Sequence, residues 1–112
     1  MDKLTVTIDE ADAALVLGRQ ADSIVSVTTS RNAALTDANA LLRCENAVSI
    51  AVLDDTATGW SGNRLLTIYQ AGTGSATFAA GSGVVFRGTA PTPAQYKSIM
   101  LMRVGANEWA YV

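Results

Sequence analysis

The sequence predicts an all-β protein, a small antiparallel β-sandwich or barrel of about eight to nine short strands. Short runs of residues alternate between apolar and polar side chains, which is the period of a half-buried strand. Turn-forming residues, glycine above all, separate these runs at intervals of roughly 8–12 residues, as in sandwiches and barrels. The length of 112 residues suits a single domain with one hydrophobic core.

The expected strands follow one another along the whole chain. The first, residues 4–8, places Leu4, Val6 and Ile8 on one face and two threonines on the other. Residues 65–70 are apolar enough to form a central strand. The remaining strands are expected at residues 24–29, 48–52, 76–78, 84–86, 98–104 and 109–112.

Two stretches fit short helical elements. Residues 9–17 open with acidic residues, continue with good helix formers and end at Gly18, as a short capped helix does. Residues 36–39 fit either one helical turn or a polar loop. Neither stretch changes the predicted fold class.

Two Gly-x-Gly turns are expected to join the strands between residues 66 and 86 into a meander, with Phe78 and Phe86 in the core. A phosphate-binding loop is the alternative interpretation. It is disfavoured because a third glycine at the required offset is missing and strand residues follow in place of a helix. The four glycines, predicted to be structural turn residues with positive φ, are Gly72, Gly74, Gly81 and Gly83.

The composition removes several classes of function. The sequence contains no histidine, which excludes Ser-His and Cys-His nucleophile pairs and zinc sites with imidazole ligands. A single cysteine, Cys44, cannot close a disulfide within the chain. Eight Lys and Arg against ten Asp and Glu leave no positive excess to neutralise phosphates, so we expect no nucleic-acid partner. We also expect no metal and no cofactor.

Membrane insertion and secretion are not expected either. The longest strictly apolar runs, such as residues 13–17, fall far short of the ~20 residues that a membrane span needs. The N-terminus lacks the basic region and apolar stretch of a signal peptide. We therefore predict a soluble protein without a membrane partner.

Three carboxylates are candidates for acid–base or metal chemistry. Asp54 and Asp55 are adjacent, and Glu45 lies nearby in the sequence. The favoured interpretation places the two aspartates in a polar loop that follows residues 48–52. We accordingly predict no catalytic residue and no enzymatic activity.

Aromatic rings are the candidates for contact with sugars, because they stack on sugar rings. The candidate glycan contacts are Trp60 and Tyr69, and Trp109 and Tyr111 are considered beside them. Aromatic residues make up only 6% of the chain, so core packing must use most of these rings. Trp109 is the weaker tryptophan candidate because it lies in an expected strand.

Part of the sequence resembles a module of tailed-bacteriophage virion proteins. In that module a strand ending in a Gln-Ala-Gly-x-Gly turn precedes a Val-Thr-Phe-like strand, an Ala-x-Gly-Ser-Gly-Val turn follows, and the closing strand ends in Asn/Asp-Glu-Trp. The resemblance spans roughly residues 41–112 and is carried by several short motifs in the right order. The matching segments are residues 42–47, 60–62, 70–74, 76–84, 95–96 and 103–109.

The resemblance implies an oligomeric part of a phage particle. We expect a non-enzymatic surface protein of the virion, such as a capsid decoration (cement) protein or a head-fibre-associated protein, assembled in the bacterial cytoplasm. Its partners would be itself, as a homotrimer, and other virion proteins such as capsid or fibre proteins. The alternative is a tail-fibre tip or receptor-binding module that recognises a host cell-surface glycan. A gene beside the capsid genes favours the first, and one among tail genes the second.

We expect residues 1–112 to form one β domain with two parts. Residues 41–112 correspond to the fibre-like module, and residues 1–32 form an N-terminal extension with a docking strand and the short helix. Fibre proteins carry a long shaft before the module, whereas this chain begins close to it. It therefore resembles a small decoration protein of the capsid, or a tip subunit docked on another protein, more than a whole fibre. Residues 1–18 are expected to dock against a neighbouring subunit or the virion, because an isolated terminal strand has an open edge.

Overall fold

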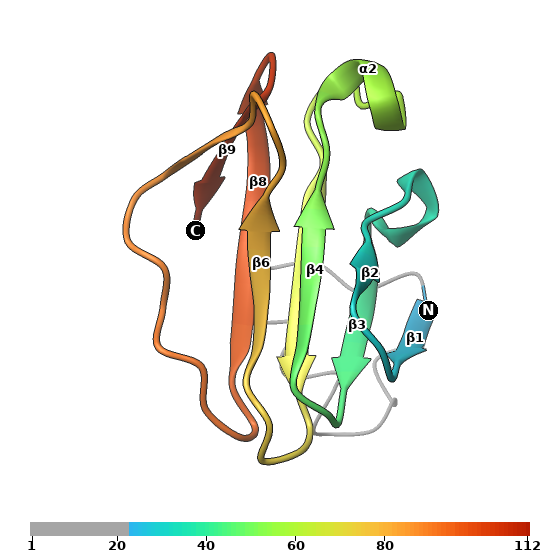
Figure 1. Ribbon diagram of the computed structural model, residues 1–112, viewed down its shortest axis with the longest axis vertical. Coiled ribbons are helices and arrows are strands. Elements are labelled where there is room, and N and C mark those ends of the chain that lie inside the picture. Colours follow the sequence, from blue (N-terminus) through green and yellow to red (C-terminus); the bar gives the residue numbers. More distant parts are fainter. Residues whose placement is uncertain (1–22) are drawn as a thin grey trace, which may run out of the picture.

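The computed structural model describes residues 23–112, and the strands form a mixed six-stranded sheet and a three-stranded sheet (Figure 1). The predicted predominance of β structure is confirmed. The strand predicted at residues 4–8 and the helix predicted at residues 9–17 lie outside the described residues. In spatial order, the larger sheet contains β1 (Ser23–Val27), β3 (Ala40–Cys44), β5 (Leu65–Gln70), β8 (Ser98–Gly105), β9 (Glu108–Tyr111) and β7 (Val85–Arg87), and the smaller sheet contains β2 (Arg31–Asn32), β4 (Val48–Val52) and β6 (Ala76–Ala80).

Two helical turns lie in the connections between strands. The 3-10 turn η2 (Leu35–Asp37) precedes β3. It overlaps residues 36–39, for which the sequence is compatible with either one helical turn or a polar loop. The turn α2 (Asp55–Thr58) follows β4 and ends at Gly59, which has the left-handed φ of 91° that favours glycine. Within residues 23–112, no helix has the length and apolarity to cross a membrane.

The chain winds between the two sheets in successive coils. The strands β1, β3 and β5 of the larger sheet are each followed by a strand of the smaller sheet, β2, β4 and β6. Within each sheet these strands are parallel neighbours, so that Ile24, Leu41 and Thr67 lie side by side. In the smaller sheet Ile50 lies beside Phe78. The coils β1–β2, β3–β4 and β5–β6 are therefore stacked, as in a short solenoid.

The strand directions differ from the antiparallel fold that the sequence predicts. Among the described strands, β8 pairs antiparallel with β5 and with β9, and the other pairs are parallel. The predicted meander through β5, β6 and β7 is also wrong, because β6 pairs with β4 and β7 pairs with β9. Residues 71–75 carry the chain across to the other sheet, whereas a hairpin turn would return it beside the same strand.

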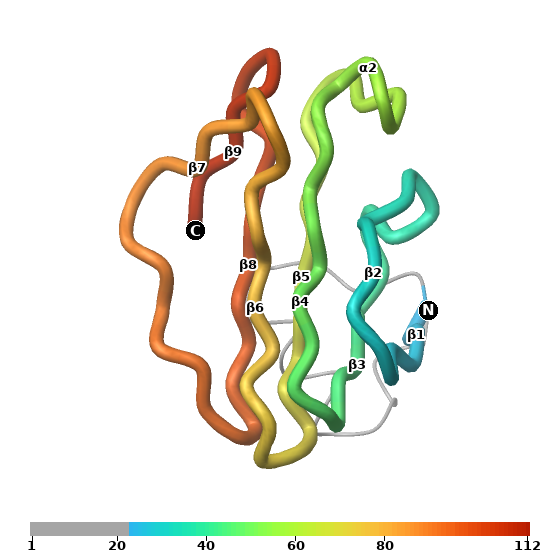
Figure 2. The backbone as a smooth tube through the Cα atoms, viewed as in Figure 1, coloured from blue at the N-terminus to red at the C-terminus, as the bar shows by residue number. Residues whose placement is uncertain are grey.

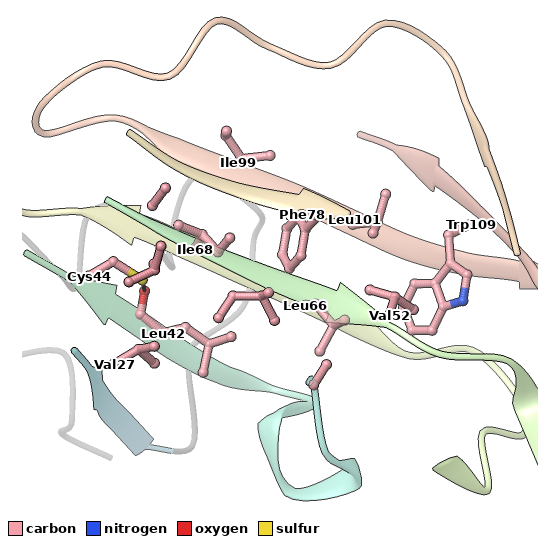
Figure 3. Close-up of a cluster of buried hydrophobic side chains, with 14 of the residues drawn as sticks. Val27, Leu42, Cys44, Val52, Leu66, Ile68, Phe78, Ile99, Leu101 and Trp109 are labelled. Atoms are coloured by element: carbon pink, nitrogen blue, oxygen red, sulfur yellow. Dashed lines mark hydrogen bonds between the residues drawn. The ribbon is translucent and has the colours of Figure 1, made fainter. Parts of the chain in front are cut away.

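One hydrophobic cluster lies between the two sheets (Figure 3). Leu66 and Leu101 enter it from the larger sheet, and Phe78 enters it from the smaller sheet. Trp109 is fully buried at one end of the cluster, and Cys44 lies toward the other as a buried free thiol. The burial of each large apolar side chain contributes roughly 1.5–3 kcal/mol, so this cluster stabilises the stacked coils.

The connection between β7 and β8, residues 88–97, swings away from the sheets before it returns to β8 (Figure 2). Near its end the amide of Tyr96 donates a hydrogen bond to the carbonyl oxygen of Gln70 at 2.6 Å. Tyr96 has a φ of 67°, which is costly for a bulky residue, and its side chain is 66% exposed. The connection therefore holds one aromatic ring at the surface in a constrained backbone.

Candidate functional site

The candidate carboxylates Asp54 and Asp55 lie at the start of α2, at one end of the sheets (Figure 1). Asp54 caps this helical turn, since its carboxylate accepts a hydrogen bond from the amide of Ala57 at 2.7 Å. Glu45 precedes β4 at the opposite end of the strand and forms an ion pair with Arg43. The five residues of β4 span roughly 15 Å, so the three carboxylates do not form one site.

Asp55 connects α2 to the turn between β8 and β9. Its carboxylate accepts hydrogen bonds from the guanidinium of Arg103 at 2.6 and 3.2 Å, and from the amide of Asn107 at 3.0 Å. The amide of Asp55 donates in return to Oδ1 of Asn107 at 2.7 Å. Arg103 also donates to the carbonyl oxygen of Gly62 at 2.8 Å. We call Asp55, Arg103 and Asn107 the clamp.

The electrostatics of the clamp indicate a structural role. The hydrogen bonds from Arg103 lower the pKa of the Asp55 carboxyl, burial opposes this effect, and the Asn107 amide lowers the pKa further. The side chains of Asp55 and Arg103 are only 19% and 13% exposed. Asp55 therefore lies in the connection after residues 48–52 that the sequence predicts, but its carboxylate is bound to a distant part of the chain. A general acid or base needs a pKa near the operating pH, and the clamp moves that of Asp55 away from it.

Trp60, a candidate glycan contact, lies inside the protein against Trp109. The two side chains are 4% and 0% exposed, and their rings meet edge to face with centroids 5.1 Å apart. This burial corrects the expectation for Trp60, because an enclosed ring has no face left for a sugar. The indole N–H groups of both residues have no hydrogen-bond partner among the described residues.

Tyr69, the other candidate glycan contact, is 5% exposed and lies on β5. Packing encloses this ring as well, so the expectation of a sugar contact is corrected in the same way. Tyr111 is half-buried and meets Phe86 edge to face, with centroids 5.7 Å apart. Burial raises the pKa of the Tyr111 hydroxyl. Packing uses all four of the aromatic residues considered for sugar contact.

The glycines predicted as structural turns do lie in connections between strands, but their backbone conformations differ from the prediction. Gly83 has the expected positive φ, 82°. Gly72, Gly74 and Gly81 do not have a positive φ, so a left-handed backbone does not explain why glycine occupies these positions. The four positions are Gly72 and Gly74, between β5 and β6, and Gly81 and Gly83, between β6 and β7.

Close packing between successive coils explains the other three glycines. A Cβ atom on Gly81 would come within 2.9 Å of the carbonyl oxygen of Val52, at the end of β4. A Cβ atom on Gly72 would overlap the carbonyl group of Glu45, and one on Gly74 would overlap the amide of Ala47. The connection after β5 thus lies directly against the connection after β3, with no room for a side chain between the two backbones. Glycine is required here because its side chain is missing.

Gln70 closes the same connection, although no role is predicted for its side chain from the sequence. The residue is 4% exposed. Its amide group donates to the carbonyl oxygen of Gly72, and its side-chain oxygen accepts from the amide of Ala76, both at 3.2 Å. The signal in the sequence was a polar residue that ends an apolar strand directly before a Gly-x-Gly turn.

An open pocket of about 420 Å³ lies between η2 and α2. Its lining is largely apolar and includes Ala33, Leu35, Leu53 and Ala57, with no ionisable side chain. Leu35 is 46% exposed. The sequence did not point to this pocket, because isolated apolar residues beside turns form no periodic pattern. The pocket is therefore an open and mainly apolar hollow of the described surface.

Comparison with known proteins identifies no relative from which a function could be inferred. No protein-family model matches the chain, and no curated protein or solved structure matches it. In the part of the chain that the structure describes, no group of three or more acidic or cysteine side chains could hold a metal ion. The resemblance to the phage module rests on the sequence motifs alone.

Proposed function

We propose that the protein is a non-enzymatic structural component of a bacteriophage virion. It is a small oligomeric surface protein of the capsid decoration or head-fibre-associated type. The motifs at residues 70–74, 76–84 and 103–109 support the phage assignment, because they resemble the virion module. The protein assembles as a homotrimer in the bacterial cytoplasm and binds other virion proteins at the particle surface.

The clamp is the observation that best supports the structural role. Asp55 is hydrogen-bonded to both Arg103 and Asn107, and these bonds fix two connections at one end of the sheets. A hydrolytic site needs a carboxylate that is open to substrate, whereas this carboxylate faces donors of its own chain. Both sheets contribute to one core cluster, which supports the sandwich form of the predicted fold, with mixed strand pairing.

The test is to look for the chain in purified particles of the phage that encodes it. Particles are banded in a density gradient, and the ratio of the chain to the major capsid protein is measured by mass spectrometry. We expect a fixed ratio across the particle fractions. A replication protein of the same phage is the control and should not be enriched. Abundance in the lysate with loss from the banded particles would contradict the proposal.

The pocket between η2 and α2 is the surface on which particle binding can be tested. Leu35→Glu places a charge at the apolar lining, and we expect at least tenfold weaker binding to particles that lack the protein. Thr56→Glu is the matched control, because Thr56 is exposed on α2 but does not line the pocket. Equal binding by both variants would place the contact elsewhere.

The alternative function, recognition of a host glycan, is favoured by Tyr96. Its ring is 66% exposed and its backbone is constrained, so it can offer a fixed face to a sugar. We expect Tyr96→Ala to reduce adsorption of the purified protein to host cells at least tenfold if this function holds. Tyr96→Phe keeps the ring face and should retain most of the adsorption. Unchanged adsorption by Tyr96→Ala would remove this alternative.

A further inference from the structure

The larger sheet has a second set of buried side chains that does not belong to the core cluster. Leu41 is 1% exposed, Leu65 is 6% exposed and Tyr69 is 5% exposed, yet none of them is part of that cluster. These residues alternate along β3 and β5 with residues that do enter the cluster. Because successive side chains of a strand point to opposite faces, they lie on the face turned away from the smaller sheet. We call this the outer face.

The centre of the outer face is covered, although its margin is open. Thr67 lies between Leu65 and Tyr69 on β5 and is also only 5% exposed. By contrast Ile24, the register partner of Leu41 on β1, is 55% exposed. The described strands belong either to this sheet or to the smaller sheet on its other side, so none of them accounts for the covered centre.

We propose that residues 1–22 of this same chain dock on the centre of the outer face. This segment joins Ser23 at the start of β1, the edge strand of the larger sheet. β5 is two strands away from β1, roughly 10 Å, and 22 residues reach far beyond that distance. The segment supplies the apolar residues that the face needs, at positions 4, 6 and 8 and in residues 13–17.

The docking is independent of the proposed function, since it depends on burial alone. It also differs from the expectation that the N-terminal segment binds a neighbouring subunit or the virion. A segment held on its own sheet covers apolar surface that would otherwise be exposed. Exchange of the segment between two copies is the competing arrangement, in which the segment covers the outer face of a neighbouring chain.

The test uses the full chain with Ala11→Cys and a nitroxide spin label on the introduced thiol. Cys44 does not compete for the label, because it is buried and burial raises the pKa of its thiol to about 11. In the ¹⁵N-labelled protein we expect much stronger broadening of the amide signals of Leu41 and Thr67 than of Ala79, which is exposed on the smaller sheet. Equal signals at these positions would overturn the proposal.

A mixed sample distinguishes docking within one chain from exchange. Spin-labelled chains without ¹⁵N are combined with ¹⁵N-labelled chains without the spin label, after unfolding and refolding together. We expect no broadening at Leu41 and Thr67 in this sample. In the first sample the spin label and ¹⁵N are on the same chain. If the broadening in the mixed sample is as strong as in that sample, the segment docks on a neighbouring copy, and the proposal is overturned.

A matched pair of variants tests the face itself. Leu65→Asp places a charge at the covered centre and should increase trypsin cleavage after Arg19 at least tenfold. Val85→Asp is the control, because Val85 is 43% exposed in β7 and should leave the cleavage rate unchanged. Tryptophan fluorescence, which comes from the buried Trp60 and Trp109, checks that each variant is folded. If Leu65→Asp does not fold, Leu41→Ala replaces it, with a smaller increase expected. Equal cleavage of the folded centre variant and the control would contradict docking on this face.

Discussion

Asp55 joins two parts of the chain that are 48 and 52 residues away in the sequence, through Arg103 and Asn107. Hydrogen bonds to charged groups contribute about 1.5–3 kcal/mol each, so we expect Asp55→Asn to lower the free energy of unfolding by about that amount. Asp54→Asn is the control and should change it by less than about 0.5 kcal/mol, because asparagine also caps a helix. Urea unfolding measures both. A small effect of Asp55→Asn would show that the clamp contributes little.

The acid side of the pH profile is a second prediction at this scale. Burial alone would raise the pKa of Asp37, but hydrogen bonds from Arg31 and the Ala34 amide outweigh it and lower the pKa. The pKa of Asp55 is lowered as well. A folded pKa below the unfolded value of 3.8 means that the stabilisation is complete above the unfolded pKa. It is lost as the pH falls through the folded pKa values.

We therefore expect Asp37 and Asp55 to cause no change in the urea concentration at the unfolding midpoint between pH 7 and about pH 5. At pH values below about 4 the midpoint should decrease. Asp55→Asn should reduce the acid-dependent decrease, since one of the two carboxylates is gone. An identical pH profile for the variant and the parent would show that Asp55 does not contribute to the acid sensitivity.

Gly72 is predicted to be intolerant of any side chain. A Cβ atom there would overlap the carbonyl group of Glu45, so the backbones of two stacked coils would have to separate. We expect Gly72→Ala to lower the free energy of unfolding by about 1–3 kcal/mol, as strained backbone substitutions do. Thr73→Ala is the control, because Thr73 is exposed in the same connection. A stabilised Gly72→Ala variant would contradict the close approach of the two connections.

At the level of elements, the positions of the strands were more predictable from the sequence than the pairing between them. The runs at residues 48–52 and 98–104 match β4 and β8 within one residue at each end. An alternation with a period of two reports which residues form a strand, but it is the same in a hairpin and in a coil that crosses between sheets. β2 was missed because two residues are too short to show any alternation.

The candidate site was predictable only where its bonds are local. The cap that Asp54 provides is contained in four consecutive residues, and its acidic start and glycine end are visible in the sequence. Arg103, the ion-pair partner of Asp55, is on β8 and is 48 residues away in the sequence. No local sequence pattern identifies a contact over that separation. The sequence could therefore indicate a polar connection after β4, but not the clamp that orders it.

β6 depends on a single large side chain for its attachment to the core. Phe78 is 7% exposed and enters the cluster between the sheets, whereas Phe86 on β7 is only partly buried. We expect Phe78→Ala to cost about 3–5 kcal/mol of stability, which is a large share of the margin of a small domain. Phe86→Ala should cost less, because part of its ring is already in water. Thermal unfolding measures both, and a larger effect at Phe86 would contradict this arrangement of the core.

At the scale of the whole molecule, several large apolar side chains of the described residues are exposed to solvent. Leu35, Val85 and Tyr96 are exposed on different elements, and the chain carries only 16% charged residues to keep such surface solvated. Association would cover part of this surface, and the resemblance to the phage module favours three copies. We expect sedimentation at micromolar concentration to give three times the mass of one chain.

The same measurement on Leu35→Glu separates association from attachment to the virion. The pocket beside Leu35 is proposed to bind other virion proteins, so this variant should remain trimeric while it loses binding to particles. Loss of the trimer in this variant would place the pocket at the contact between copies. A parent protein that sediments as a single chain, and stays so as its concentration is raised tenfold, would remove the homotrimer from the proposed function, because the exposed apolar residues would then be tolerated without association.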